Sequence, residues 1–126
     1  MHHDHHYKTN LRDIEFNLFE AYRTQEYLGE APFDEMDVET VKHILREIDR
    51  LAREDFAASF VEADRTPLEL SHGEIELPYG VTKSLDAIYE GGWDKLAYKS
   101  ELGGFGAPPT LGWAVEELLV GANPAA

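Results

Sequence analysis

From Val38 to Asp64 the chain reads VETVKHILREIDRLAREDFAASFVEAD, and apolar side chains return in it every three or four residues. This spacing places them on one face of an α-helix, with charged residues opposite. The face consists of Val38, Val41, Leu45, Ile48, Ala52, Phe56 and Phe60, widened by Ile44, Leu51 and Ala58. Asp37 can cap this helix, and Pro67 prevents its easy continuation. We predict a helix of about 27 residues, roughly 40 Å long at 1.5 Å per residue, as the backbone of the fold.

Three other segments have helical periodicity. The first covers residues 12–28 and ends at Gly29, because glycine accepts the left-handed conformation found after helices. The second covers residues 81–93, and the third begins at Thr110 as its N-cap and ends at Gly121. Their apolar positions are Ile14, Leu18, Phe19 and Tyr22, then Val81, Leu85, Ile88 and Tyr89, then Leu111, Ala114, Val115, Leu118 and Leu119.

Residues 68–77 change to a period of two. Leucine and isoleucine alternate there with Glu69, Glu74 and Glu76, and Ser71-His72-Gly73 supplies turn residues. Such alternation around a turn is typical of a small β-hairpin. The predicted fold class is therefore all-α, with one small β-hairpin around residues 68–77.

The first ten residues are expected to form a disordered, His-rich arm before a single helical domain over residues 11–126. Four histidines surround Asp4 in this arm and could bind a metal ion. An expression tag or a native flexible start is the favoured interpretation, because a mobile arm has no second shell to orient ligands. We assign no metal site.

Composition limits the partners that this chain can have. Its 126 residues carry a formal net charge of −14, which repels phosphate backbones and anionic lipid. We therefore expect no nucleic-acid partner, and no run of residues is apolar enough for a membrane span. The chain has no cysteine, so disulfides and thiolate metal sites are excluded. A cytoplasmic location is the default expectation.

No catalytic constellation is visible in the sequence. Gly103-Gly104-Phe105-Gly106 lacks the Lys-Ser/Thr that completes a phosphate-binding Walker loop, so by itself it predicts a turn. The pairs Asp34-Glu35 and Glu116-Glu117 are poor acid–base candidates, because neighbours on a helix point about 100° apart. The residues alone thus indicate an acidic, mostly helical domain without a catalytic residue.

Several stretches together resemble the start of acyl-CoA dehydrogenases, in the subgroup with an added N-terminal segment. They are His6-Tyr7-Lys8-Thr9-Asn10 with Leu11-Arg12-Asp13, Phe16-Asn17-Leu18-Phe19-Glu20, Ala63-Asp64-Arg65, Gly91-Gly92-Trp93-Asp94, Glu101-Leu102-Gly103-Gly104-Phe105-Gly106 and Gly121-Ala122-Asn123-Pro124-Ala125. The resemblance covers essentially the whole chain. Its most specific element is Glu-Leu-Gly-Gly-x-Gly, which recurs across that superfamily just before a core helix. Bacterial members of the subgroup are broad-range, long-chain enzymes.

The resemblance implies a fragment of a larger enzyme. Similar enzymes join a helical N-terminal domain, a β-domain and a C-terminal helical bundle, and bind FAD largely through the last two. A glutamate of the C-terminal part removes the α-proton of the acyl-CoA while a β-hydride passes to the flavin. This chain resembles the N-terminal domain alone, so we expect it to hold no catalytic base and no flavin, and to be inactive by itself. The implied partners of the full enzyme are acyl-CoA, an electron-transfer acceptor and the remainder of its own chain.

By the same resemblance, Asn123, Ala125 and Ala126 lie at the beginning of the cavity for the acyl tail. Small residues there would leave room for an alkyl chain, which binds through apolar burial at ~0.8 kcal/mol per CH₂. The competing interpretation is ordinary packing at the end of a helix. Gly103, Gly104 and Gly106 form the motif turn.

Two interpretations of the whole chain stay open on sequence alone. One is the N-terminal part of the dehydrogenase; the other is a stand-alone, acidic helical module for protein interaction. The helix over residues 110–120 is apolar nearly all round, which predicts burial on several sides. We therefore also expect homo-oligomers, with this helix and its Leu118 at the interface.

Overall fold

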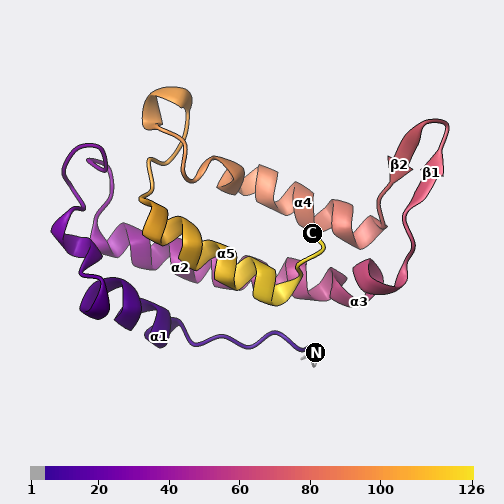
Figure 1. The fold of residues 1–126 in the computed structure, drawn as a ribbon, viewed down its shortest axis with the longest axis horizontal. Coiled ribbons are helices and arrows are strands. Elements are labelled where there is room, and N and C mark those ends of the chain that lie inside the picture. Colours follow the sequence, from indigo (N-terminus) through magenta and orange to yellow (C-terminus); the bar gives the residue numbers. More distant parts are fainter. Residues whose placement is uncertain (1–4) are drawn as a thin grey trace.

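The computed structural model describes residues 5–126 and confirms an all-α domain with a small hairpin (Figure 1). Its helices and strands are α1 (Leu11–Glu15), α2 (Val38–Leu51), α3 (Ala57–Arg65), β1 (Glu69–Ser71), β2 (Glu74–Glu76), α4 (Tyr79–Gly91) and α5 (Pro109–Ala122). Two π-helical turns, Phe16–Ala21 and Ala52–Phe56, continue α1 and α2. Short 3₁₀ turns cover Thr24–Glu26, Trp93–Lys95 and Ser100–Leu102.

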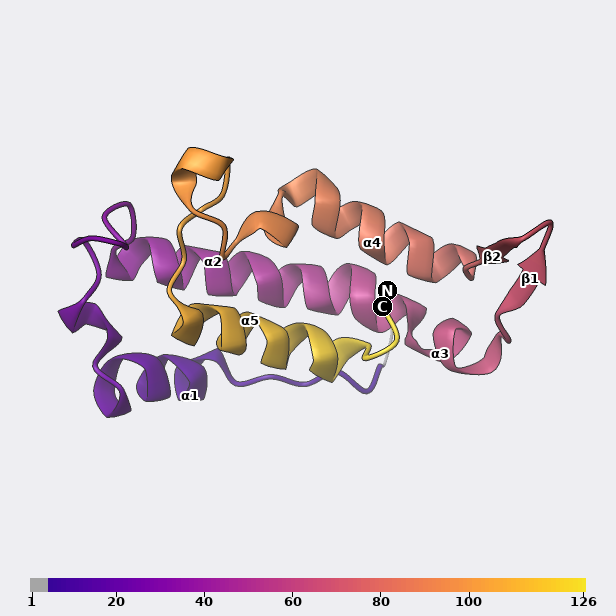
Figure 2. The same ribbon diagram turned by 45° about the horizontal axis from the view of Figure 1, so that its top comes forward.

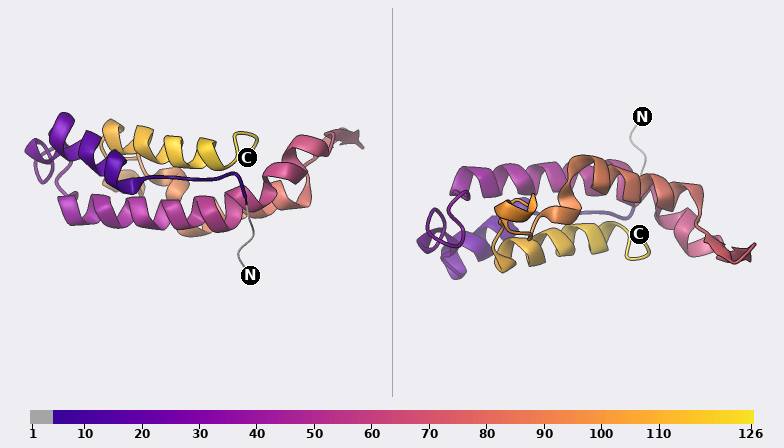
Figure 3. Two further views of the ribbon diagram at one scale, coloured as in Figure 1. Left: turned by 90° about the horizontal axis from the view of Figure 1, so that it is seen from below. Right: turned by 90° about the horizontal axis from the view of Figure 1, so that it is seen from above.

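The long helix α2–α3 is the axis of the molecule, and the other helices lie along it. Each successive long element reverses direction, so that α4 runs against α2–α3 and α5 runs back alongside it (Figures 1 and 2). The core lies between α2 and α5, where Leu45, Ile48, Leu111 and Leu118 are fully or almost fully buried. Views from above and below show both described ends of the chain near the end of α5 (Figure 3).

The predicted central helix is confirmed in its extent and its start. Helical residues follow one another without a break from Val38 to Arg65, and Asp37 caps α2 by accepting a hydrogen bond from the Thr40 amide at 2.7 Å. The π-helical turn was not predicted. A π turn holds extra chain per turn, so the buried face shifts behind it. Ala57 and Ser59 are consequently buried, while Ala58, expected on the apolar face, is exposed.

The first helix is shorter than the helix predicted over residues 12–28. The helical segment stops at Ala21 rather than Leu28, because Arg23 adopts a left-handed backbone with φ 52°. Thr24 then turns inward and is fully buried, whereas Tyr22 stays 70% exposed. Gly29 has a positive φ, but it lies in the following loop and ends no α-helix.

The two C-terminal helices begin earlier than predicted. α4 starts at Tyr79 and ends where Gly92 takes a left-handed conformation, and its Tyr89 is exposed rather than inward-facing. α5 starts at Pro109, whose fixed φ suits a first helical position, so Thr110 is not its N-cap. Helix α5 also passes through Gly121 and ends at Ala122.

The N-terminal arm has a defined course from residue 5 onward, unlike the disordered arm predicted for residues 1–10. Residues 1–4, with His2, His3 and Asp4, lie outside the described residues. Tyr7 is only 4% exposed, and the His6 ring packs on Phe60 with centroids 4.1 Å apart. The arm therefore lies against the helices and contributes to the core.

The hairpin projects from the end of the molecule beyond α3 and α4 (Figures 1 and 2). Its strands are antiparallel, with Leu70 opposite Ile75, and the His72-Gly73 turn has two positive φ angles. The prediction around residues 68–77 is thus confirmed. Within residues 5–126, no helix is both long enough and apolar enough to cross a bilayer.

Candidate functional site

Asn123 is buried at the end of α5 and is held by two hydrogen bonds. Its side-chain amide donates to the Ser59 hydroxyl at 2.8 Å, and its side-chain carbonyl accepts from the Ala125 amide at 3.0 Å. Only 2% of the residue is exposed. The Asn123 side chain therefore fixes the path of the chain as it leaves α5 and reverses toward Ala126.

Ser59 connects this end of α5 to the helix α4. Its hydroxyl lies 2.8 Å from the Ser84 hydroxyl, and both serines are buried. Ser84 also lies within hydrogen-bond distance of the backbone carbonyls of Asp55 and Gly80. Each hydroxyl has a single proton, so these contacts share donors. The result is a polar connection inside the molecule between α3, α4 and α5.

Sequence analysis missed Ser59 and Ser84. Both are small polar residues on otherwise apolar helix faces, Ser59 beside Phe56 and Ser84 one turn after Val81. A buried hydroxyl needs a hydrogen-bond partner, so such positions signal an internal polar contact. The partner could not be found without the tertiary structure, because Ser59 and Asn123 are 64 residues apart.

The other two residues of the predicted acyl-tail site lie directly beyond Asn123. Ala125 is exposed, whereas Ala126 is partly buried against the core. The amide of Ala126 is 3.4 Å from the Asn123 carbonyl oxygen, which completes the reversal of the chain. The three residues thus form one small structural unit at the end of α5, open on the side of Ala125.

The motif turn folds back on the segment that follows α4. Gly103 and Gly106 have φ angles of 82° and 66°, which only glycine adopts without strain. At Gly104 a Cβ atom would collide with the backbone carbonyl of Tyr98, so the close approach requires glycine there as well. Phe105, between them, stacks on Trp93 with ring centroids 5.6 Å apart.

The backbone amides of this turn are already used. Those of Gly103, Gly104 and Gly106 donate to the carbonyls of Ser100, Lys99 and Tyr98 at 2.9, 3.1 and 2.8 Å. Phosphate-binding loops point such amides at the ligand. The turn is therefore a structural connection that places the start of α5, and it has no free cradle for a phosphate.

The sequence of this chain is similar to that of a known protein. No family model matches the chain. Over 122 residues, or 95% of its length, the chain is 42% identical to a broad-specificity linear acyl-CoA dehydrogenase, FadE5, of Mycobacterium tuberculosis. The chain belongs to the acyl-CoA dehydrogenase family. It spans a fifth of the length of that relative.

In this member of the acyl-CoA dehydrogenase family, the two pairs of neighbouring carboxylates considered from the sequence lie at the surface. Glu116 and Glu117 are both exposed on α5, and Asp34 and Glu35 are exposed in the loop before α2. In the same range, no three His, Asp or Glu side chains lie close enough to hold a metal ion. Exposure leaves both pairs in solvent, and the absence of a catalytic base from this chain stays a prediction.

The arm that precedes α1 in this family member is attached through Tyr7. The phenol donates to the Asp49 carboxylate at 2.7 Å, and Arg53 pairs with the same carboxylate at 3.1 Å. The Arg53 guanidinium also lies 5.3 Å from the centre of the Tyr7 ring. Burial, and then the neighbouring Asp49, raise the pKa of Tyr7 above its ordinary range, so the phenol remains a donor.

Proposed function

We propose that this chain is the N-terminal helical part of a FAD-dependent acyl-CoA dehydrogenase. The enzyme would introduce an α,β double bond into acyl-CoA thioesters in fatty-acid β-oxidation. The supporting observation is the 42% identity to an acyl-CoA dehydrogenase over nearly the whole chain. Within such an enzyme the chain supplies scaffold and the start of the acyl-tail pocket, and the catalytic base belongs to another part.

The partners follow from this proposal. The whole enzyme, a cytoplasmic homo-oligomer, would bind acyl-CoA and pass electrons to an electron-transfer acceptor. This chain would contact the remainder of its own polypeptide. Its net charge of −14 disfavours binding of the CoA end, which carries several negative charges. The chain would therefore contact the uncharged acyl tail of the substrate.

FAD, when bound to the whole enzyme, would accept the hydride from the substrate. The described residues do not fit a site for its pyrophosphate, because the amides of the Gly-rich turn donate to backbone carbonyls. The carboxylates exposed nearby on α5, such as Glu116, would oppose a phosphate. The flavin site is accordingly assigned to other parts of the enzyme.

Asn123, Ala125 and Ala126 would contribute the first wall of the acyl-tail pocket. The anchoring of Asn123 by Ser59 holds this segment in place, and the two alanines leave the space beside it free of long side chains. Enlarging Ala125 to Phe would fill that space. Each buried CH₂ of a substrate contributes ~0.8 kcal/mol, so long acyl chains would lose more than short ones.

A chimera tests the proposal. The matched segment of the mycobacterial enzyme is replaced by this chain, and flavin content and acyl-CoA oxidation are measured. We expect a yellow enzyme that oxidises acyl-CoA, whereas the same relative with the segment deleted stays inactive. A chimera that folds but neither retains flavin nor oxidises any acyl-CoA would contradict the proposal.

The acyl-tail assignment is tested in that chimera with Ala125→Phe. We expect kcat/KM to fall by about tenfold or more for long acyl chains and to change little for short ones. Tyr89→Phe, exposed on α4, is the control. Equal losses for all chain lengths would indicate ordinary packing at the end of the helix.

The encoding reading frame distinguishes the enzyme fragment from the stand-alone interaction module. A stop codon after Ala126 favours the module.

A further inference from the structure

An elongated groove runs between α1 and α5, on a side of α5 that takes no part in the Asn123 contacts. Ile14 and Leu18 line it from the α1 side and Ala114 from α5, in a hollow of about 440 Å³. A second hollow of about 260 Å³ shares Ile14 and extends along α5 as far as Gly121. We call the two together the α1–α5 groove. From Trp113 to Gly121 it follows roughly 12 Å of helix at 1.5 Å per residue.

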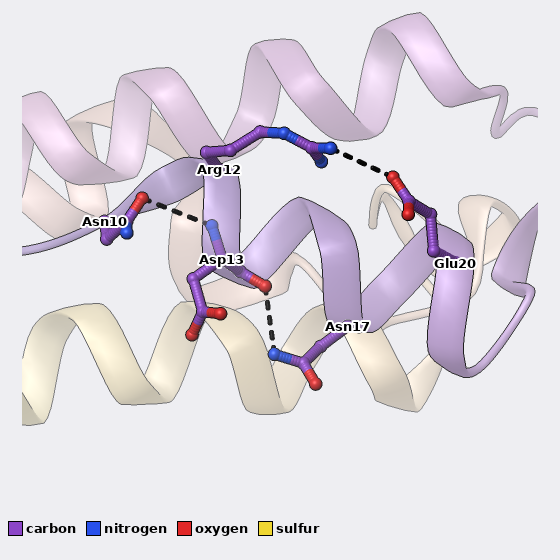
Figure 4. Close-up of polar contacts among 5 residues, drawn as sticks. All are labelled: Asn10, Arg12, Asp13, Asn17 and Glu20. Atoms are coloured by element: carbon purple, nitrogen blue, oxygen red, sulfur yellow. Dashed lines mark hydrogen bonds and ion pairs between the residues drawn. The ribbon is translucent and has the colours of Figure 1, made fainter.

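Two carboxylates, Asp13 and Glu117, line both hollows. Among residues 5–126, neither of them forms an ion pair. The nearest arginine in sequence, Arg12, is paired with Glu20 at 3.1 Å. Figure 4 shows that Asn10 and Asn17 bind the backbone of Asp13, which leaves its carboxylate out of these contacts. The larger hollow is therefore lined by two carboxylates and no cationic side chain, whereas Lys8 lines the second hollow.

Two exposed aromatic side chains complete the groove. Trp113, 76% exposed, lies one helical turn before Glu117 on α5, and Tyr22, 70% exposed, lines the same hollow from the end of the first helical segment. Aromatic faces attract cations, and indole is the strongest of them. A guanidinium can stack on such a ring while it donates to a carboxylate, which an ammonium does less well. Carboxylates and aromatics together are thus complementary to arginine.

We propose that the α1–α5 groove binds a polypeptide segment of a protein partner, in which an arginine is flanked by apolar side chains. The arginine lies between Trp113 and the carboxylates of Asp13 and Glu117, and its neighbours cover Ile14 and Leu18. A second copy of this chain is a poor occupant, because each copy carries a net charge of −14. The inference does not depend on the dehydrogenase reaction.

Peptide binding to the 126-residue chain tests the proposal. The probe is an amphipathic peptide of about twelve residues, with leucines at helical spacing around one central arginine. Its control replaces that arginine by citrulline, which has the same shape without the charge. The chain carries Trp93→Phe, so that Trp113 is the sole indole and its fluorescence reports on the groove. We expect saturable binding, weakened about tenfold or more by citrulline and weakened by salt.

Matched variants locate the binding site. Asp13→Asn with Glu117→Gln should weaken the arginine peptide about tenfold and the citrulline peptide little. Glu90→Gln with Glu101→Gln removes the same charge at exposed positions outside the groove and should have no effect. Circular dichroism checks that every variant is folded, and Glu117→Gln alone is used where the double variant is not.

Three results would overturn the proposal. The first is equal affinity for the arginine and citrulline peptides, and the second is the absence of saturable binding up to about 1 mM peptide. The third is concentration-dependent sedimentation of the chain that Trp113→Ala abolishes, which would identify a second copy as the occupant.

Discussion

At the scale of single residues, Tyr7 shows most clearly how the N-terminal segment is attached. Its ring is buried and its phenol donates to Asp49, which is also held by Arg53. The apolar ring and the polar tip thus stabilise the arm in two different ways. The Tyr7→Phe variant separates them, because it keeps the ring and removes the donor.

We expect Tyr7→Phe to lower the free energy of unfolding by about 1.5–3 kcal/mol, as for other hydrogen bonds to charged groups. Urea denaturation measures the change. Tyr89→Phe, on an exposed side chain, is the matched control and should have almost no effect. Equal stability of the two variants would mean that the bond to Asp49 contributes nothing.

The cap of the central helix depends on pH through another single residue. The Asp37 carboxylate accepts from the Thr40 amide, and these hydrogen bonds hold the pKa of Asp37 below its ordinary value. A lowered native pKa means that the stabilisation is fully present above the unfolded pKa of about 3.9 and is lost as pH falls through the native value. Asp37→Ala should therefore melt at a lower temperature than the parent at neutral pH.

The difference in melting temperature should shrink as the pH is taken below about 3.9. Thermal melts followed by circular dichroism at several pH values measure it. Asp34→Ala, in the loop before the helix, is a control that should show no such trend. A difference that is constant from neutral to acid pH would contradict the charged cap.

At the scale of elements, two glycines near α5 have opposite surroundings. A Cβ atom at Gly104 would meet the backbone of Tyr98, whereas one at Gly112, inside α5, would meet nothing within 4 Å. The motif turn needs Gly104 because the Tyr98 backbone approaches it closely. In α5, by contrast, Gly112 makes no such contact and lowers the stability of the helix. Substitution by alanine should therefore lower the free energy of unfolding at Gly104 and raise it at Gly112.

We expect Gly104→Ala to destabilise the chain by about 1–3 kcal/mol, because the turn must open. Gly112→Ala should stabilise it by roughly 0.5–1 kcal/mol, since alanine is the better helix former. Chemical denaturation of both variants provides the comparison. Destabilisation by Gly112→Ala, or tolerance of Gly104→Ala, would contradict these surroundings.

At the scale of the whole molecule, the helix α5 combines a buried and an exposed side. Leu111 and Leu118 are buried in the core, so a Leu118→Glu variant would unfold the chain rather than test an interface. Trp113 and Val120 are the apolar side chains of α5 left exposed. Large apolar side chains for a contact between α5 and a partner are therefore Trp113 and Val120, and the buried Leu118 does not fit the interface predicted from sequence.

The isolated chain should be colourless and inactive. We expect no retained FAD and no oxidation of acyl-CoA, because the amides of the Gly-rich turn already donate to backbone carbonyls and the catalytic base is expected in another part of the enzyme. Absorbance after purification with added FAD, and an assay with an electron acceptor, measure both. A yellow, flavin-retaining preparation with turnover would contradict this account.

Local sequence determined most of the elements of this protein. Residues 38–64 could form only a helix, because their apolar side chains return at its period, and Asp37 and Pro67 limit it. The hairpin was equally determined by its alternation and its His72-Gly73 turn. The Gly-rich motif at residues 103–106 predicted a turn, since glycine adopts the positive φ angles of Gly103 and Gly106 without strain.

Tertiary structure decided what depends on contacts between distant residues. The left-handed Arg23, which ends the first helix early, accompanies the burial of Thr24 and has no local signature. The place of the arm depends on Asp49, 42 residues from Tyr7, and the role of Asn123 depends on Ser59. Such contacts form only when helices pack, because a buried polar group must find whichever partner the packing brings near it. The α1–α5 groove has the same origin, since neither helix alone encloses it.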